Sequence, residues 1–233
     1  MILAISFLSG LSTPLGALVV LRFRTLRPWM LSFILALASG VMVTVVVTEL
    51  APASLNTGGI PAFISGCVFG VVSMAFFTGL WKSGDPSLSR LRRTGQSIAL
   101  AIAVHDLPEG MAIGAGHSLH AKLGIIMALA IALHNMPEGM SIAAPLAASG
   151  VGRRKIVAQT LLISLITPMG TLVPLMLGSV SHAINAVILA FAAGAMLYVV
   201  VQDTLPESWR ENRAAAVLGL VAGAALMGSL AAW

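Results

Sequence analysis

Two polar motifs interrupt the apolar sequence and carry residue types that bind metal ions. HDLPEG occupies 105–110, and HNMPEG follows at 134–139, 29 residues later. Each motif has a histidine, a glutamate four residues after it and a proline between the two. Imidazole nitrogens and carboxylate oxygens are ligands of Zn²⁺ and related divalent ions. The recurrence of letters and spacing favours a shared chemical role over chance composition.

Helical geometry gathers the polar side chains of each motif on one face. At about 100° per residue, Glu109 lies between His105 and Asp106 around the helix. The second motif repeats this arrangement with His134, Asn135 and Glu138. Two facing helices would therefore have imidazoles on one flank, Asp106 and Asn135 on the other, and bridging glutamates. The sequence predicts a divalent-metal site built from these six residues.

The surroundings of the motifs place this site inside a membrane. The connection around 118–121 is short, so the two motif helices are expected to be antiparallel neighbours with their motifs at one depth. Pro108 and Pro137 each remove a backbone donor, and we expect them to bend and open their helices there. Irregular backbone at that depth requires contact with protein or water.

Composition identifies the whole chain as a polytopic membrane protein. Of 233 residues, 58% are hydrophobic and only 9% charged, whereas soluble domains carry about a quarter charged residues. We predict an all-α fold, a single transmembrane domain over 1–233, with eight transmembrane helices, each long enough for a ~30 Å hydrocarbon core. The predicted spans are 2–21, 30–50, 60–81, 96–116, 123–148, 156–178, 184–205 and 214–232.

The basic residues indicate orientation rather than nucleic-acid binding, despite a sequence pI near 10.4. Twelve of the 13 Lys and Arg lie in the first, third, fifth and seventh connections, and only Lys122 lies opposite. The positive-inside rule puts those connections in the cytoplasm and both termini outside it. We expect the inner membrane of a bacterium, with membrane lipid as a partner and no nucleic acid.

A second repeat joins the second and seventh spans. The segments 39–54 and 193–208 align without a gap at an offset of 154, with Glu49 opposite Asp203. The two spans run in opposite directions in the predicted topology. The sequence therefore predicts a 3+2+3 arrangement, an inverted repeat of spans 1–3 and 6–8, which is a recurring plan of secondary transporters.

The doubled motif, the eight spans and the GVM…ELAP and GAM…LPES segments resemble the ZIP (Zrt/Irt-like protein) family of metal transporters. The resemblance implies uptake of Zn²⁺, and often Fe²⁺, Mn²⁺, Co²⁺ or Cd²⁺, into the cytoplasm by alternating access. It also implies that spans 1, 4, 5 and 6 move against a dimer-forming scaffold of spans 2, 3, 7 and 8, so a homodimer is expected. The metal is cargo, and no cofactor is expected.

The resemblance also assigns residues to two adjacent metal sites. A primary site is implied for His105, Glu109, His134 and Glu138, with Met42 as a possible soft ligand. A second site is implied for Asp106, Asn135 and the shared glutamates. Family members commonly complete it with a glutamate from E-P-x-G on the sixth helix. Thr167 occupies that position here, in TPMG, so we expect one tightly bound metal and a weak or empty second position.

Other polar residues are candidates for the metal pathway, each against an ordinary structural role. Glu49 is a candidate for the outer entrance, and Asp203 and Glu207 for the inner exit. Gln159 on the sixth span either reaches the cavity or bonds within the bundle. The outer-loop histidines His117, His120 and His182 are expected to be solvated rather than metal-binding.

The alternative function is an intramembrane metal-dependent enzyme. A zinc hydrolase favours H-E-x-x-H, which the sequence lacks. A carboxylate di-iron enzyme favours Glu-x-x-His pairs, whereas both motifs here read His-x-x-x-Glu. A metal-sensing or structural membrane protein would need an extramembrane domain that the spans leave no room for. We therefore predict a transporter and not an enzyme.

Overall fold

The fold is helical throughout the residues that the computed structural model describes, which are 1–23, 25–82, 88–119, 121–177 and 181–231. The elements are α1 (Ile2–Gly10), α2 (Ser12–Leu21), α3 (Pro28–Val45), η1 (Val46–Leu50), α4 (Ala51–Lys82), α5 (Arg90–Leu119), α6 (Ala121–Ala148), α7 (Arg153–Ser164), α8 (Ile166–Leu177), α9 (His182–Val199), η2 (Val200–Thr204), α10 (Leu205–Glu211) and α11 (Arg213–Ala231). The all-α prediction is confirmed. Arg24 and His120 lie outside the described residues.

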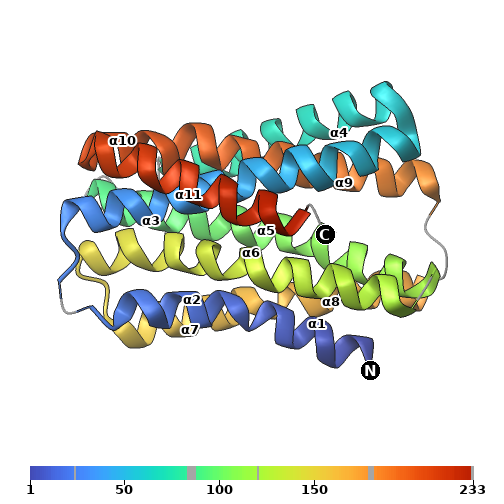
Figure 1. Cartoon of the computed structure of the whole chain (residues 1–233), viewed down its shortest axis with the longest axis horizontal. Coiled ribbons are helices and arrows are strands. Elements are labelled where there is room, and N and C mark those ends of the chain that lie inside the picture. The colour runs from blue at the N-terminus through green and yellow to red at the C-terminus, as the bar shows by residue number, and fades with distance from the viewer. Residues whose placement is uncertain (24, 83–87, 120, 178–180, 232–233) are drawn as a thin grey trace.

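The helices form three layers, with the motif-bearing pair in the middle (Figure 1). The central helices α5 and α6 pack against each other. On one side, α1 and α2 pack on α6, and α7 and α8 pack on α5; on the other, α3 packs on α6 and α9 on α5. The outer pairs are α4 with α9 and α11 with α3. The two motifs are thus enclosed on both sides.

Six helices among the described residues are long and apolar enough to cross a membrane. One of them, Pro28–Gly79, has 52 residues and is broken at Gly59, where φ is 69°. Glycine adopts this backbone conformation without the strain that a Cβ would add. The last apolar helix, Arg213–Ser229, is shorter. The connection between the second and third predicted spans is shorter than expected, because the helix continues as far as Gly58.

The first and sixth predicted spans are each one long apolar helix, Ile2–Leu21 and Arg153–Met176. Each has a one-residue irregularity, at Leu11 and at Leu165, where the backbone keeps right-handed helical dihedral angles, and these positions differ by 154. Pro14 and Pro168 follow each irregularity by three residues, and each proline removes the backbone donor for the residue four positions earlier. The two irregularities pack together, because a Cβ added to Gly10 would overlap the Ser164 carbonyl oxygen.

The central helices, in contrast, continue through their prolines. Both α5 and α6 continue past Pro108 and Pro137 without interruption, and the predicted bend at these prolines stays a prediction. Packing on both sides holds each helix in register. A neighbouring side chain also engages a carbonyl close to Pro108, since Thr171 Oγ1 donates to the Gly110 oxygen at 2.9 Å.

Two π-helical segments also share the offset of 154. The segment η1 covers 46–50 and η2 covers 200–204, and they carry Glu49 and Asp203. Short π-helical segments are rare and frequently lie at functional sites. The helices that lead into them, α3 and α9, run in opposite directions along the bundle (Figure 1). Equivalent positions therefore have the same unusual backbone in both halves of the chain.

Candidate metal centre

The six motif side chains form a buried polar cluster between α5 and α6. None is more than 3% exposed. They belong to two helices that pack along their length. The cluster consists of His105, Asp106, Glu109, His134, Asn135 and Glu138. The structure thus brings together all the residues that the doubled motif selected.

Two reciprocal histidine–glutamate pairs join the helices. His105 Nε2 lies 3.2 Å from Glu138 Oε1, and His134 Nε2 lies 3.1 Å from Glu109 Oε1. Each motif therefore provides the partner for the histidine of the other. His105 Nε2 is also 3.7 Å from Asp106 Oδ1. Ligand atoms of His105, Asp106 and Glu109 lie within 4.8 Å of one another, so one ion could contact all three.

Many polar atoms in the cluster have no hydrogen-bond partner. The second carboxylate oxygens of Glu109 and Glu138 are buried without one, as are both oxygens of Asp106 and both polar atoms of the Asn135 amide. Buried polar groups in native proteins are nearly always hydrogen-bonded. So many unpartnered acceptors at one point are what a cation-binding site requires before its ion is added.

The energetic cost of this cluster argues against a purely structural role. An ionised acid at the bilayer centre costs roughly 2.5–3.5 kcal/mol on insertion scales. Three carboxyl groups are buried here, those of Asp106, Glu109 and Glu138, and each is costly to keep ionised at this depth. A bound divalent cation offsets this cost, whereas helix packing alone does not.

Comparison with known proteins identifies the family. Residues 81–231 match the profile of the family described as ZIP zinc transporter, and this region includes the whole cluster. The chain belongs to the ZIP zinc transporter family. It is 33% identical to the zinc transporter ZupT of Chlorobium phaeovibrioides, over 97% of this chain and 94% of that protein. It is 33% identical to ZupT of Stenotrophomonas maltophilia, over 98% of this chain and 93% of that protein. It is 31% identical to ZupT of Corynebacterium glutamicum, over 96% of this chain and 95% of that protein.

In this ZIP protein, two further residues predicted to contact the metal or its pathway lie on the α3–η1 helix beside the cluster. Met42 is fully buried in the core that α3 shares with α5 and α6. Glu49 is half-buried on η1 and close enough to interact electrostatically with His134 and Glu109. Both positions are compatible with the predicted roles of soft ligand and entrance acid, which stay predictions.

The predicted exit residues lie at the other end of the bundle. Asp203 is buried on η2 and accepts a hydrogen bond from Ser97 Oγ of α5 at 2.7 Å. Glu207, one turn further on α10, is also buried. Both line a cavity of about 290 Å³ between α5 and the η2–α10 segment. The structure therefore joins these two acids in one polar space, although their part in transport stays a prediction.

Thr167 is next to the cluster, and a second threonine that sequence reasoning missed has an equivalent position. Thr167 is fully buried, its Oγ1 has no partner, and its carbonyl oxygen packs on Gly110. Thr13 has the same three properties, with its carbonyl oxygen on Gly139. Each threonine thus packs beside a site glutamate. The signal was present in the sequence, because TPLG at 13–16 repeats as TPMG at 167–170.

The remaining candidates lie away from the cluster or at its margins. Gln159 is half-buried on α7, His117 is half-buried near the end of α5, and His182 is exposed at the start of α9. The exposed position of His182 agrees with the expected solvated histidine. A role for Gln159 in the pathway stays a prediction.

Proposed function

We propose that this protein carries divalent transition metal, zinc foremost, across the inner membrane of a bacterium into the cytoplasm. The observation that carries the proposal is the buried cluster of two histidines and three carboxylates, with its unpartnered oxygens. Membership of a family of zinc transporters supports the same conclusion, and confirms the prediction of a transporter rather than an enzyme. The ion is cargo that the cluster binds and releases.

The proposed topology has eight crossings. It divides the 52-residue helix at Gly59 and counts the short apolar helix Arg213–Ser229 as a span. The connections α2–α3, α6–α7 and α10–α11 gather at one end of the bundle, and the N-terminus lies at the other (Figure 1). The basic residues of these connections belong to the first end, which supports a cytoplasmic location for it.

An inverted repeat of the first three and last three spans is the proposed framework for alternating access. Three pairs of features at an offset of 154 support it: the helix irregularities, the TPxG segments and the two π-helices. In this proposal α1, α2 and α5–α8 move as one unit against α3, α4 and α9–α11. The layers in Figure 1 correspond to this division.

A homodimer formed through the second unit is also proposed. The lipid-facing side of α4 has a continuous exposed apolar surface that includes Ile64, Val68, Val72 and Phe76. Large exposed apolar patches on membrane-embedded helices contact either lipid or another protein chain. Dimerisation through α4 would leave the moving unit free on the opposite side.

Charge balance supports one tightly held ion at the centre. With neutral imidazoles as ligands, the three carboxylates carry a formal charge of −3, and one divalent ion reduces this to −1. A second divalent ion would change the residual charge from −1 to +1, and the first ion would repel it across the two glutamates that both ions share. Thr167, and now Thr13, supply hydroxyls rather than charge to the second position.

Zinc uptake by the purified protein in sealed vesicles tests the function. Wild-type protein should accumulate zinc in the vesicles, and Glu138→Ala should not, because a divalent ion needs that carboxylate to offset its lost hydration. Leu133→Ala is the matched control, since Leu133 is half-exposed and lies one residue before a predicted ligand. Normal uptake by a well-inserted Glu138→Ala protein would overturn the assignment.

A further inference from the structure

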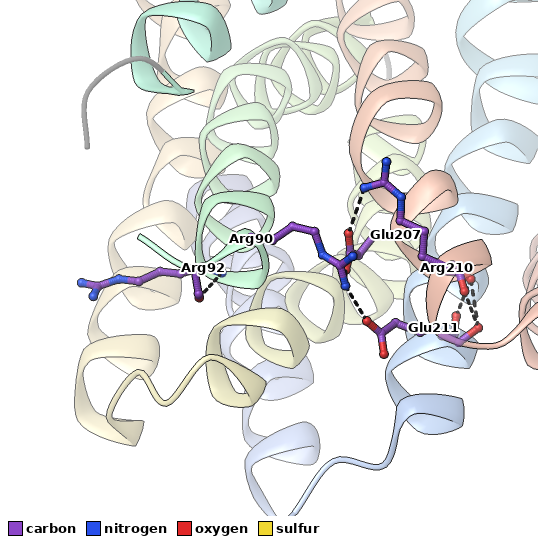
Figure 2. Close-up of polar contacts among 8 residues, drawn as sticks. Arg90, Arg92, Glu207, Arg210 and Glu211 are labelled. Atoms are coloured by element: carbon purple, nitrogen blue, oxygen red, sulfur yellow. Dashed lines mark hydrogen bonds and ion pairs between the residues drawn. The ribbon is translucent and has the colours of Figure 1, made fainter. Parts of the chain in front are cut away.

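An arginine joins the motif-bearing helix to the opposite layer at the basic end of the bundle (Figure 2). Arg90 is the first residue of α5. Its Nη2 lies 2.9 Å from Glu207 Oε1 and 2.8 Å from Glu211 Oε1, both on α10. Arg92, two residues further on α5, points away from these acids (Figure 2). One guanidinium thus holds two carboxylates of the facing element.

This ion pair is stronger than an ordinary surface contact. Exposed pairs contribute little, but this pair is half-buried: the Arg90 side chain is 50% exposed, that of Glu207 only 3% and that of Glu211 17%. The other nearby cation, Arg210, approaches Glu207 only to 3.9 Å. Removing one partner of a buried pair leaves an uncompensated charge, which is strongly unfavourable. Arg90 is therefore the main cation that neutralises Glu207.

The pair borders a polar cavity on the face of α5 that also carries the metal-site residue His105. Arg90, Thr94, Ser97, Ala101 and His105 follow one another at intervals of three or four residues, so they share one face of α5. This face spans about 22 Å from the cluster to the end of the helix. Ser97 contacts Asp203, and the cavity of about 290 Å³ is lined by Thr94, Asp203 and Glu207. Arg90 is also part of the wall of this cavity.

We propose that Arg90, paired with Glu207 and Glu211, is a latch that closes the inner exit of the metal pathway. The inference rests on the proposed transport function. When the latch is closed, the guanidinium occupies the carboxylates that a departing cation would use, and its charge repels that cation. Arginine does not lose its charge in proteins, so the exit opens when Arg90 moves away from the α10 carboxylates, and a shift of α5 relative to α10 would move it. Because α5 also carries the metal ligands, such a shift would also move the helix that binds the ion.

Thiol labelling of the cavity tests the latch without measuring transport. The reporter is Thr94→Cys in a Cys67→Ala background, because Cys67 is the only native cysteine and Thr94 is a buried residue of the cavity wall. A membrane-impermeant maleimide is applied from the basic face in everted membrane vesicles. Adding Arg90→Gln should raise the labelling rate about tenfold, the effect of a coupling of roughly 1.4 kcal/mol. Glu211→Gln, which leaves Glu207 paired, should raise it less.

Arg92→Gln is the matched control and should leave the rate unchanged. Equal rates for Arg90→Gln and Arg92→Gln would overturn the proposal. If Arg90→Gln is poorly folded by size-exclusion chromatography, the exchange Arg90→Glu with Glu211→Arg provides the test. Slow labelling of the exchanged protein supports the latch, and fast labelling overturns it. If the Thr94→Cys variants label as expected but the wild-type protein shows no zinc uptake, the transport function is refuted while the closure of this cavity by Arg90 stands.

Discussion

The two π-helical segments, η1 and η2, have the same backbone conformation but differ in their side chains and in those of the residues that follow them. Positions 49, 53 and 57 lie along η1 and the start of α4. Adding 154 to each gives positions 203, 207 and 211, which lie along η2 and α10. The first set reads Glu, Ala, Thr, and the second reads Asp, Glu, Glu. Both ends present an acid towards the central helices, but only the second has further carboxylates for an ion pair.

The facing helices differ in the same way. Ser97 of α5 hydrogen-bonds to Asp203, whereas the residue at the corresponding place in the second motif helix is Ile126. The common backbone brings an acid near the centre from either side, and the differing residues decide which end is held by polar contacts. Similar halves can therefore have different roles in one transport cycle.

The largest effect is expected at the centre, where the two halves are most alike. Glu109→Ala and Glu138→Ala should each reduce zinc uptake by at least about 100-fold, since each removes a buried charge that the ion needs, worth roughly 3 kcal/mol. Because the histidine–glutamate pairs are reciprocal, the two losses should be similar. Uptake rates per molecule of inserted protein measure this. A loss in only one variant would show that the halves bind the ion unequally.

The second-site threonine should control how many ions the centre holds. Thr167→Glu should change the stoichiometry from one tightly bound metal per chain to two, because four carboxylates balance two divalent ions. Thr167→Val, which removes the hydroxyl without adding charge, is the control and should retain one. Elemental analysis of purified protein measures both. Two metals in the wild-type protein would show that the threonine does not have this consequence.

Substitutions at the two π-helical segments should change different kinetic parameters of zinc uptake. Glu49→Gln should raise the zinc concentration for half-maximal uptake several-fold with little change in maximal rate, because it removes a charge that attracts the ion before binding. Asp203→Asn should mainly lower the maximal rate, because it acts after release from the centre. Initial uptake rates over a range of zinc concentrations separate the two effects. The same kinetic change in both variants would remove the distinction between entrance and exit.

The smallest effect is expected for stability at the basic end. Glu211→Gln should lower the free energy of unfolding by no more than about 1 kcal/mol, because Glu211 is partly exposed and solvent screens its pairing with Arg90. Thermal unfolding in detergent, compared with Arg92→Gln, measures the difference. A much larger loss would mean that Glu211 supports the fold rather than the latch alone.

The chemistry of the centre and the helical class could be predicted from the sequence. A helix fixes which side chains share a face, so His105, Asp106 and Glu109 had to lie together, and the second motif repeats them. Low charge and long apolar segments require membrane helices, because a bilayer leaves no other partner for backbone polar groups. The offset of 154 was visible in the letters of η1 and η2, although their π-helical backbone was not.

Only the tertiary structure decided which prolines accompany a helix irregularity and which residues meet across helices. Pro108 and Pro137 stand in helices packed on two sides and stay within them, whereas one-residue irregularities precede Pro14 and Pro168, where α1–α2 crosses α7–α8. Proline removes a donor everywhere, but the surrounding packing determines how the backbone responds. The meeting of Arg90 with Glu207 and Glu211 likewise joins residues more than 100 positions apart. Such a contact depends on how α5 and α10 pack in three dimensions, and local sequence patterns do not predict which residues far apart in the chain will meet.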